Sequence, residues 1–132
     1  MDLLQVTPDY LQKIWPKIYG ILKTAVDQND GFIMADVYQA ISNGTMQLWI
    51  AADRSEIKGV GVTQIYNFPQ KRNCLLLFTA GMEFDHWRHL LSDIERWAIS
   101  QGCKDLEFYG RRGWLKKDLD YTPTTVLFRK IL

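Results

Sequence analysis

Length, composition and charge restrict what this chain can be. It has 132 residues, of which 47% are hydrophobic and 13% aromatic, enough for one domain with its own core. The formal net charge is +1, from 16 basic and 15 acidic residues, so composition gives no electrostatic reason to expect nucleic acid or an anionic membrane as partner. No segment approaches the roughly 20 apolar residues of a membrane span, and no signal peptide is recognisable. We therefore expect a single cytoplasmic domain over residues 1–132.

The two cysteines follow no metal-binding or redox pattern. Cys74 lies in an apolar run and Cys103 follows a glycine, and neither has a CxxC or Cys/His neighbour pattern. We expect two buried, reduced thiols. His86 and His89 are one helical turn apart, but no distant ligand pattern accompanies them, so no metal site is predicted.

The first third of the chain predicts one short strand and two helices. Residues 2–6 read as a strand, and Thr7-Pro8 has the character of an N-cap followed by a first helical residue. The helix that follows keeps its apolar spacing, although Pro16 is expected to kink or restart it. A second helix is expected over Met34–Ile41, ended by Asn43-Gly44.

An antiparallel meander of three strands is predicted next. The strands are Met46–Ala52, Ile57–Tyr66 and Asn73–Ala80, with no helical interruption between them. Gly59 and Gly61 lie on one face of the middle strand, so that face lacks side chains over two positions. A bulge, helix packing or the approach of a ligand can each account for this.

The last third alternates helix and strand. An amphipathic helix is predicted to begin near Asp85 and to stop at Gly102. A short strand over Leu106–Tyr109 follows, which such a connection usually places parallel to the strand before it. Gly110–Gly113 then turns the chain into a short helix, and Thr124–Ile131 alternates as a final strand.

This order of elements resembles that of the GCN5-related N-acetyltransferase (GNAT) superfamily. The resemblance implies an α/β (α+β) fold, in which a mixed sheet has an antiparallel meander followed by a β-α-β-α unit, with helices on both faces. A narrower similarity, to short acetyltransferase-like proteins of tailed bacteriophages, rests on Leu48-Trp49, Val60-Gly61-Val62-Thr63, Ile94–Ala98, Gly102-Cys103 and Gly110–Trp114.

The resemblance also implies a cofactor site. The pantetheine arm of acetyl-CoA would lie where the strands Asn73–Ala80 and Leu106–Tyr109 splay apart, and its pyrophosphate would lie at the N-terminus of the helix near Asp85. The residues at the implied cofactor positions are Phe78, Thr79, Ala80, Gly81, Arg88, Gly110, Arg111, Arg112 and Trp114.

Acyl transfer to an amine needs a base for the amine and an acid for the departing thiolate. The superfamily's usual tyrosine on the last helix has no counterpart, and Tyr109 is our candidate in its place, ahead of Tyr121. Glu83 is our candidate base. Asp85 and Glu107 are further possibilities by location, although capping explains Asp85 and exposure on a strand explains Glu107.

The segment before the cofactor helix departs from the superfamily pattern. Ala80–His86 has one glycine, no arginine and two carboxylates, Glu83 and Asp85, which oppose an anionic ligand. Basic side chains that can offset them are Arg88, Lys71, Arg72, Arg111 and Arg112.

Two hypotheses therefore stay open. One is an acetyl-CoA-dependent N-acyltransferase acting on an unidentified small-molecule or protein amine. The other is a catalytically degenerate phage accessory or virion-associated protein that uses the same fold to bind a phage or host protein.

Overall fold

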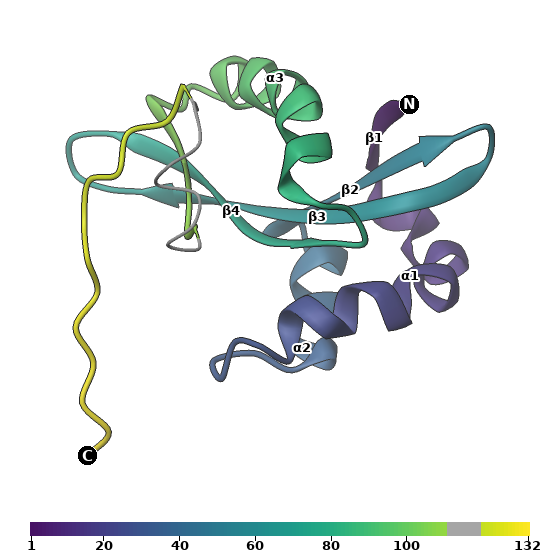
Figure 1. The fold of residues 1–132 in the computed structure, drawn as a ribbon, viewed down its shortest axis with the longest axis horizontal. Coiled ribbons are helices and arrows are strands. Elements are labelled where there is room, and N and C mark those ends of the chain that lie inside the picture. Colours follow the sequence, from purple (N-terminus) through teal and green to yellow (C-terminus); the bar gives the residue numbers. More distant parts are fainter. Residues whose placement is uncertain (111–119) are drawn as a thin grey trace.

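A five-stranded sheet separates two layers of helices in the computed structural model, which describes residues 1–110 and 120–132 apart from the side chains of Phe84 and Asp85. Helices α1 and α2 cover one face of the sheet and α3 covers the other (Figure 1). The strands lie in the order β1-β2-β3-β4-β5, and neighbours are antiparallel except for the parallel pair β4 and β5. The predicted fold class is confirmed.

The strands and helices lie close to their predicted positions. The strands are β1 (Asp2–Val6), β2 (Met46–Asp53), β3 (Glu56–Asn67), β4 (Arg72–Ala80) and β5 (Asp105–Phe108). A 3-10 turn, η1 (Pro8–Tyr10), leads into α1 (Leu11–Val26), which is followed by α2 (Met34–Ser42) and α3 (Phe84–Ser100). The predicted turn over Gly110–Gly113, apart from Gly110, lies outside the described residues, and so does the short helix predicted after it. None of the described helices is long and apolar enough to cross a membrane.

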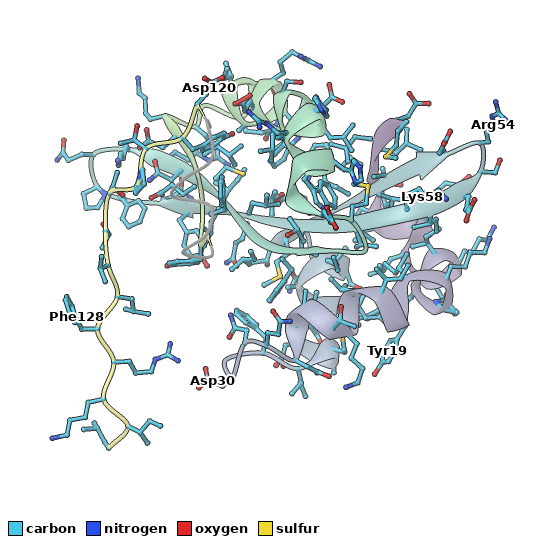
Figure 2. The ribbon with its side chains drawn as sticks, viewed as in Figure 1. Tyr19, Asp30, Arg54, Lys58, Asp120 and Phe128 are labelled. Carbon is cyan, nitrogen blue, oxygen red and sulfur yellow. The ribbon has the colours of Figure 1, made fainter. Side chains whose placement is uncertain are left out.

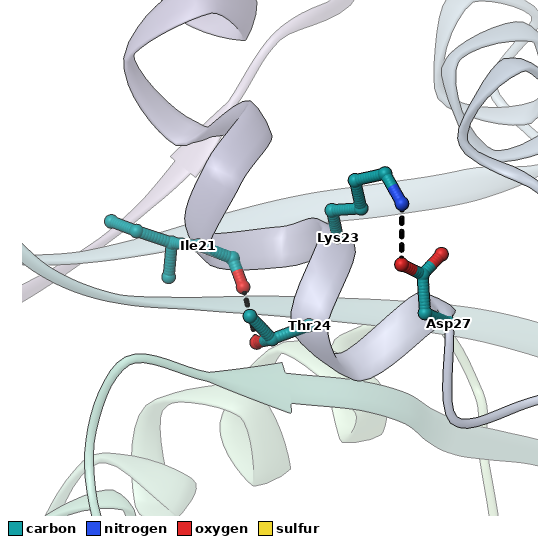
Figure 3. Close-up of polar contacts among 4 residues, drawn as sticks. All are labelled: Ile21, Lys23, Thr24 and Asp27. Atoms are coloured by element: carbon teal, nitrogen blue, oxygen red, sulfur yellow. Dashed lines mark hydrogen bonds and ion pairs between the residues drawn. The ribbon is translucent and has the colours of Figure 1, made fainter.

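Helix α1 is not restarted at Pro16, which lies inside it. Thr7 is the N-cap of the preceding 3-10 turn, as predicted, but its side chain makes no capping hydrogen bond. The last turn of α1 is closed by polar contacts: Thr24 Oγ1 donates to the Ile21 carbonyl at 2.7 Å, and Lys23 pairs with Asp27 (Figure 3).

The alternation of the central strands builds two separate cores. Leu48 and Ile50 of β2 belong to the core under α1 and α2, whereas Trp49 and Ala51 belong to the core under α3. Side chains of a strand point alternately to the two faces, so one strand supplies both layers. All four of these side chains are buried.

Helix packing explains the bare face of β3. Trp87 of α3 is fully buried against Gly59 and Gly61. A Cβ atom added to Gly59 would lie 3.1 Å from Trp87 Cζ2, and one added to Gly61 would lie 3.2 Å from Trp87 Cη2. The two glycines therefore make room for the indole ring, which holds α3 on the sheet.

One extra residue interrupts β4. Val62 of β3 pairs with Phe78 and Thr63 pairs with Leu76, so Leu77 has no partner in the register and forms a bulge. Leu76 belongs to the core under α3, but Leu77 and Phe78 both pack into the core under α1 and α2. The bulge thus changes which layer the second half of β4 serves.

The predicted final strand over Thr124–Ile131 is wrong. Residues 122–132 belong to no strand, and the chain runs extended along the β5 side of the molecule (Figure 1). Its apolar side chains are exposed, Val126 at 73% and Phe128 at 90%, and Phe128 points away from the rest of the molecule (Figure 2). The alternation is real, but a strand forms only where a neighbouring edge accepts its hydrogen bonds.

Candidate functional site

The pairing between the parallel strands β4 and β5 ends halfway along β4. Their pairing covers Asn73–Leu76 on β4 and Asp105–Phe108 on β5, and β5 ends there. Strand β4 continues to Ala80, so the edge of Leu77–Ala80 on that side has no strand partner within the described part of the chain. The bulge at Leu77 lies at this point of separation. Beyond Leu76 the two described strands are therefore no longer paired, at the place where the resemblance implies that they splay apart.

The side chains along this free edge belong mostly to the core. Phe78 and Ala80 are buried, and the ring of Phe32 meets that of Phe78 edge-on with centroids 5.8 Å apart. Thr79 is half-buried. A ligand at this edge would therefore meet mainly backbone N–H and C=O groups. Such groups on a free strand edge suit an extended chain that contains amides.

A tight turn joins the free edge to α3. Gly81 has φ +89°, and a Cβ added there would lie 2.7 Å from the Lys58 carbonyl oxygen. Glu83 is the N-cap of α3, with extended backbone and no capping hydrogen bond from its side chain. The prediction that Asp85 is the N-cap is wrong: the turn at Gly81 reverses the chain quickly enough for α3 to begin at Phe84, which makes Asp85 the second helical residue.

An open pocket lies beside this turn, on the side away from β5. Its lining residues are Met1, Lys58, Gly81, Met82, Glu83 and His86. The first turn of a helix has backbone N–H groups without intrahelical partners and the positive end of the helix dipole, which suit an anion. The carboxylate of Glu83 acts against an anion here, and Lys58 and His86 are the basic side chains in the lining.

Lys58 was not identified from the sequence. It lies on β3 (Figure 2), at the place where the register with β2 shifts. Its ammonium nitrogen is 3.1 Å from Glu56 Oε2. Only the pairing of β3 with β4 brings it to the Gly81 turn. No local motif around Lys58 signals this position.

Two of the basic residues considered as compensation lie at the wrong end of β4. Lys71 pairs with Asp105 at 2.6 Å, and Arg72 donates to the Gln101 carbonyl at 2.9 Å. Both therefore connect the start of β4 to β5 and to the end of α3, far along the strand from Gly81. Arg88, exposed one turn into α3, remains near the expected pyrophosphate position.

Three of the predicted cofactor residues, Arg111, Arg112 and Trp114, lie outside the described residues. Gly110, the residue before them, is exposed.

The two predicted catalytic residues occupy opposite ends of the free edge. Tyr109 directly follows β5 and is 79% exposed, next to the last pair Leu76 and Phe108. Glu83 lies beyond Ala80 at the other end. The four residues of β4 between these ends span about 13 Å at the usual rise of a strand. Tyr109 and Glu83 therefore do not form one cluster.

Tyr121 and Glu107 have structural partners. The Tyr121 hydroxyl donates to Glu95 Oε2 at 3.0 Å and its ring lies 5.0 Å from that of Phe108. Burial, and next the bond to Glu95, raise the pKa of Tyr121. Glu107 Oε1 accepts a hydrogen bond of 2.8 Å from Asn73 Nδ2. Neither side chain is free to serve a substrate without giving up these contacts.

The cysteines differ from the prediction that both are buried. Cys74 is fully buried, and burial raises its pKa to about 12, but Cys103 is only partly buried. Among the described residues, no three His, Cys, Asp or Glu side chains are grouped closely enough to hold a metal ion.

Solved structures with this arrangement include several acetyltransferases. An aminoglycoside acetyltransferase from an uncultured soil metagenomic sample matches with a TM-score of 0.71 and 10% identity over 99% of this chain and 95% of that one. A GNAT family acetyltransferase of Staphylococcus aureus gives 0.66 and 16% over the whole of both chains.

A ribosomal-protein-alanine N-acetyltransferase of Brucella melitensis gives a TM-score of 0.61 and 10% identity over 97% of this chain and 100% of that one. No protein-family model and no curated protein sequence matches the chain. At these identities the likeness shows the fold, so the chain has the GNAT fold.

Proposed function

We propose that this protein is an acetyl-CoA-dependent N-acyltransferase whose acceptor is a small-molecule or protein amine. The observation that carries the proposal is the free edge of β4 over Leu77–Ala80, which leads directly to the N-terminus of α3. The free edge suits the extended, amide-containing pantetheine arm of acetyl-CoA, and the helix N-terminus suits the pyrophosphate that follows this arm. Structural neighbours that are named as acetyltransferases support the same reaction class.

Some of the residues present favour the cofactor, and the carboxylate of Glu83 opposes it. The backbone of Leu77–Ala80 would hold the pantetheine amides, and the first turn of α3 would hold the pyrophosphate with Lys58 and Arg88 nearby. Glu83 weakens binding because its carboxylate lines the same pocket as Lys58. The bound cofactor would supply the acetyl thioester that the amine attacks.

Tyr109 is the better placed of the two proposed catalytic residues. It follows the strand that borders the splay, where the thioester end of an extended arm would lie, and its hydroxyl would protonate the departing thiolate. Glu83 lies toward the pyrophosphate end, so it would act as a base only through intervening water. Tyr109→Phe is expected to lower kcat with little change in cofactor affinity.

Calorimetric titration with acetyl-CoA tests the proposal directly. Wild-type protein should bind, Lys58→Ala should bind about two- to fivefold more weakly, and Glu83→Gln should bind more tightly because a like charge is removed. Lys17→Ala, an exposed lysine on α1, is the matched control and should bind as the wild type does. Folded protein that shows no binding at millimolar acetyl-CoA would overturn the proposal.

A second candidate function is favoured by the position of Glu83. An anionic cofactor needs positive potential at the N-terminus of α3, and the carboxylate of Glu83 at the N-cap lowers that potential. A protein with the GNAT fold that no longer binds the cofactor would have no need to avoid a carboxylate there. In that case the protein would be a phage accessory or virion-associated protein that binds another protein. Failure of both the wild type and Glu83→Gln to bind acetyl-CoA would favour this candidate.

A further inference from the structure

The pocket beside the Gly81 turn combines apolar and basic side chains. Met1 and Met82 line it together with Lys58 and His86, and its volume is about 310 Å³. Ligand pockets begin near about 300 Å³, so this one is large enough for a single flat ring system. Methionine side chains make favourable contacts with aromatic rings through their sulfur atoms. The pocket therefore suits an aromatic ring that carries a phosphate group close by.

A buried indole N–H lies next to this pocket. Trp87 is fully buried, and its Nε1 has no hydrogen-bond partner among the described residues. A Cβ added to Gly59 would lie 3.1 Å from Trp87 Cζ2 and 3.0 Å from Met82 Cε, so Met82 packs beside this edge of the ring. The same edge carries Nε1, because Cζ2 and Nε1 are bonded to the same carbon of the indole. A buried donor without an acceptor is costly, so this N–H indicates a ligand acceptor that reaches it past the flexible side chain of Met82.

The pocket lies where the cofactor path of the proposed function would end. That path begins at Tyr109, follows the free edge Leu77–Ala80 and reaches the first turn of α3 past Gly81. In acetyl-CoA the thioester, the pantetheine arm, the pyrophosphate and the adenosine 3′-phosphate follow one another in this order. A thioester beside Tyr109 and a pyrophosphate at α3 leave the adenosine 3′-phosphate for the pocket, which lies beside the turn on the side away from β5.

We propose that this pocket binds the adenosine 3′-phosphate of acetyl-CoA, an inference that rests on the proposed acetyl-CoA-dependent function. Met1 and Met82 contact the adenine ring, and a ring nitrogen of adenine accepts the N–H of Trp87. Lys58 contacts the 3′-phosphate. The adenosine is thus recognised by side chains outside the free edge of β4, whereas the pantetheine arm is held by the backbone of that edge.

The charges around the pocket limit how strongly it attracts phosphate. The contact of Lys58 with Glu56, 3.1 Å between side chains that are 40% and 71% exposed, is weak enough for a phosphate to replace it. Glu83 lines the same pocket, and its carboxylate opposes the phosphate. Contacts to the adenine ring are therefore needed for binding, and phosphate alone should bind more weakly.

Adenosine 3′,5′-bisphosphate, the nucleotide half of CoA, tests the pocket without the pantetheine arm. With isotope-labelled methyl groups, the four methionines of the chain give separate NMR signals. The bisphosphate should shift the signals of Met1 and Met82 and leave those of Met34 and Met46, which lie in the core under α1 and α2. Inorganic pyrophosphate should shift the first two signals much less. Equal shifts with both probes, or none with the bisphosphate at millimolar concentration, would refute the adenosine site.

Two variants separate contact with the ring from general effects on the fold. Met82→Ala should weaken bisphosphate binding about fivefold, because one wall of the adenine site is lost. Ile33→Ala, at an exposed apolar position before α2, is the matched control and should bind as the wild type does. The indole N–H signal of Trp87 should also move, with that of Trp15 on the other face of the sheet as the reference. Unchanged affinity in Met82→Ala would count decisively against the proposal.

Titration with acetyl-CoA distinguishes this inference from the proposed function. The cofactor should move the backbone amide signals of residues 77–80 together with the methyl signals of Met1 and Met82. If the amide signals move and the methyl signals do not, the protein binds acetyl-CoA but holds its adenosine elsewhere, and the assignment of the pocket is wrong. If neither acetyl-CoA nor the bisphosphate binds, both proposals fail.

Discussion

At the scale of single residues, the turn between β2 and β3 places two side chains in a backbone conformation that favours glycine. Arg54 has φ 50° and Ser55 has φ 72°, the two positive angles of a type I′ hairpin turn. Ser55→Gly should therefore raise the free energy of unfolding by about 1 kcal/mol. Urea denaturation measures this, with Ser55→Ala as the control that should bring no gain. An unchanged midpoint for Ser55→Gly would contradict the strain.

The glycine of the β4–α3 turn should tolerate no side chain. Gly81→Ala combines a positive φ with a contact of 2.7 Å to the Lys58 carbonyl, and we expect a loss of about 2 to 4 kcal/mol in unfolding free energy. Gly20→Ala is the matched control, because a Cβ at Gly20 inside α1 meets nothing within 4 Å. That variant should gain about 0.5 to 1 kcal/mol. Thermal unfolding of both variants separates the two outcomes.

At the scale of elements, α3 is docked by one indole ring over two glycines. Gly61→Ala should cost about 1 to 3 kcal/mol, because the new Cβ would press on Trp87 at 3.2 Å. Against a Trp87→Leu background the same substitution should cost much less, since the ring is gone. A double-mutant cycle by urea denaturation measures this coupling, and strictly additive effects would count against the packing described above.

The elements also show what sequence patterns can and cannot predict. The meander and α3 were predictable because alternation, helical spacing and turn residues are local signals. The bulge at Leu77 and the approach of Lys58 to Gly81 depend on register between strands, which no local pattern contains. The splay was expected through the resemblance alone. Tyr109 was expected inside a strand, but β5 ends one residue earlier at Phe108.

At the scale of the whole molecule, Cys74 is expected to make the free energy of unfolding fall as the pH becomes alkaline. Burial raises its pKa from the ordinary 9.0 to about 12, so the unfolded chain releases this proton at lower pH than the folded chain does. Its contribution to stability is complete below pH 9 and is lost as pH rises from 9 toward 12. The loss is at most about 1.4 kcal/mol per pH unit.

Cys74→Ala should flatten the fall of unfolding free energy between pH 9 and pH 10.5, measured by urea denaturation. A residual slope is expected because the pKa values of Tyr66 and Tyr121 are also raised, chiefly by burial. Cys103→Ala, at a partly exposed position, should change the slope less. Equal slopes for the wild type and Cys74→Ala would show that Cys74 ionises as readily in the folded protein as in the unfolded one.

The bulge at Leu77 determines where β4 can lose a residue without changing the faces of its neighbours. Deleting Leu77 would make Leu76 and Phe78 neighbours. Because these two side chains already face opposite layers and pair with the adjacent residues Thr63 and Val62, regular pairing with β3 would be restored. The deletion would remove only the packing of Leu77 itself against the core under α1 and α2. The loss of a residue from the regularly paired part of β4, by contrast, would turn the side chains on one side of the deletion to the opposite face and disturb both layers.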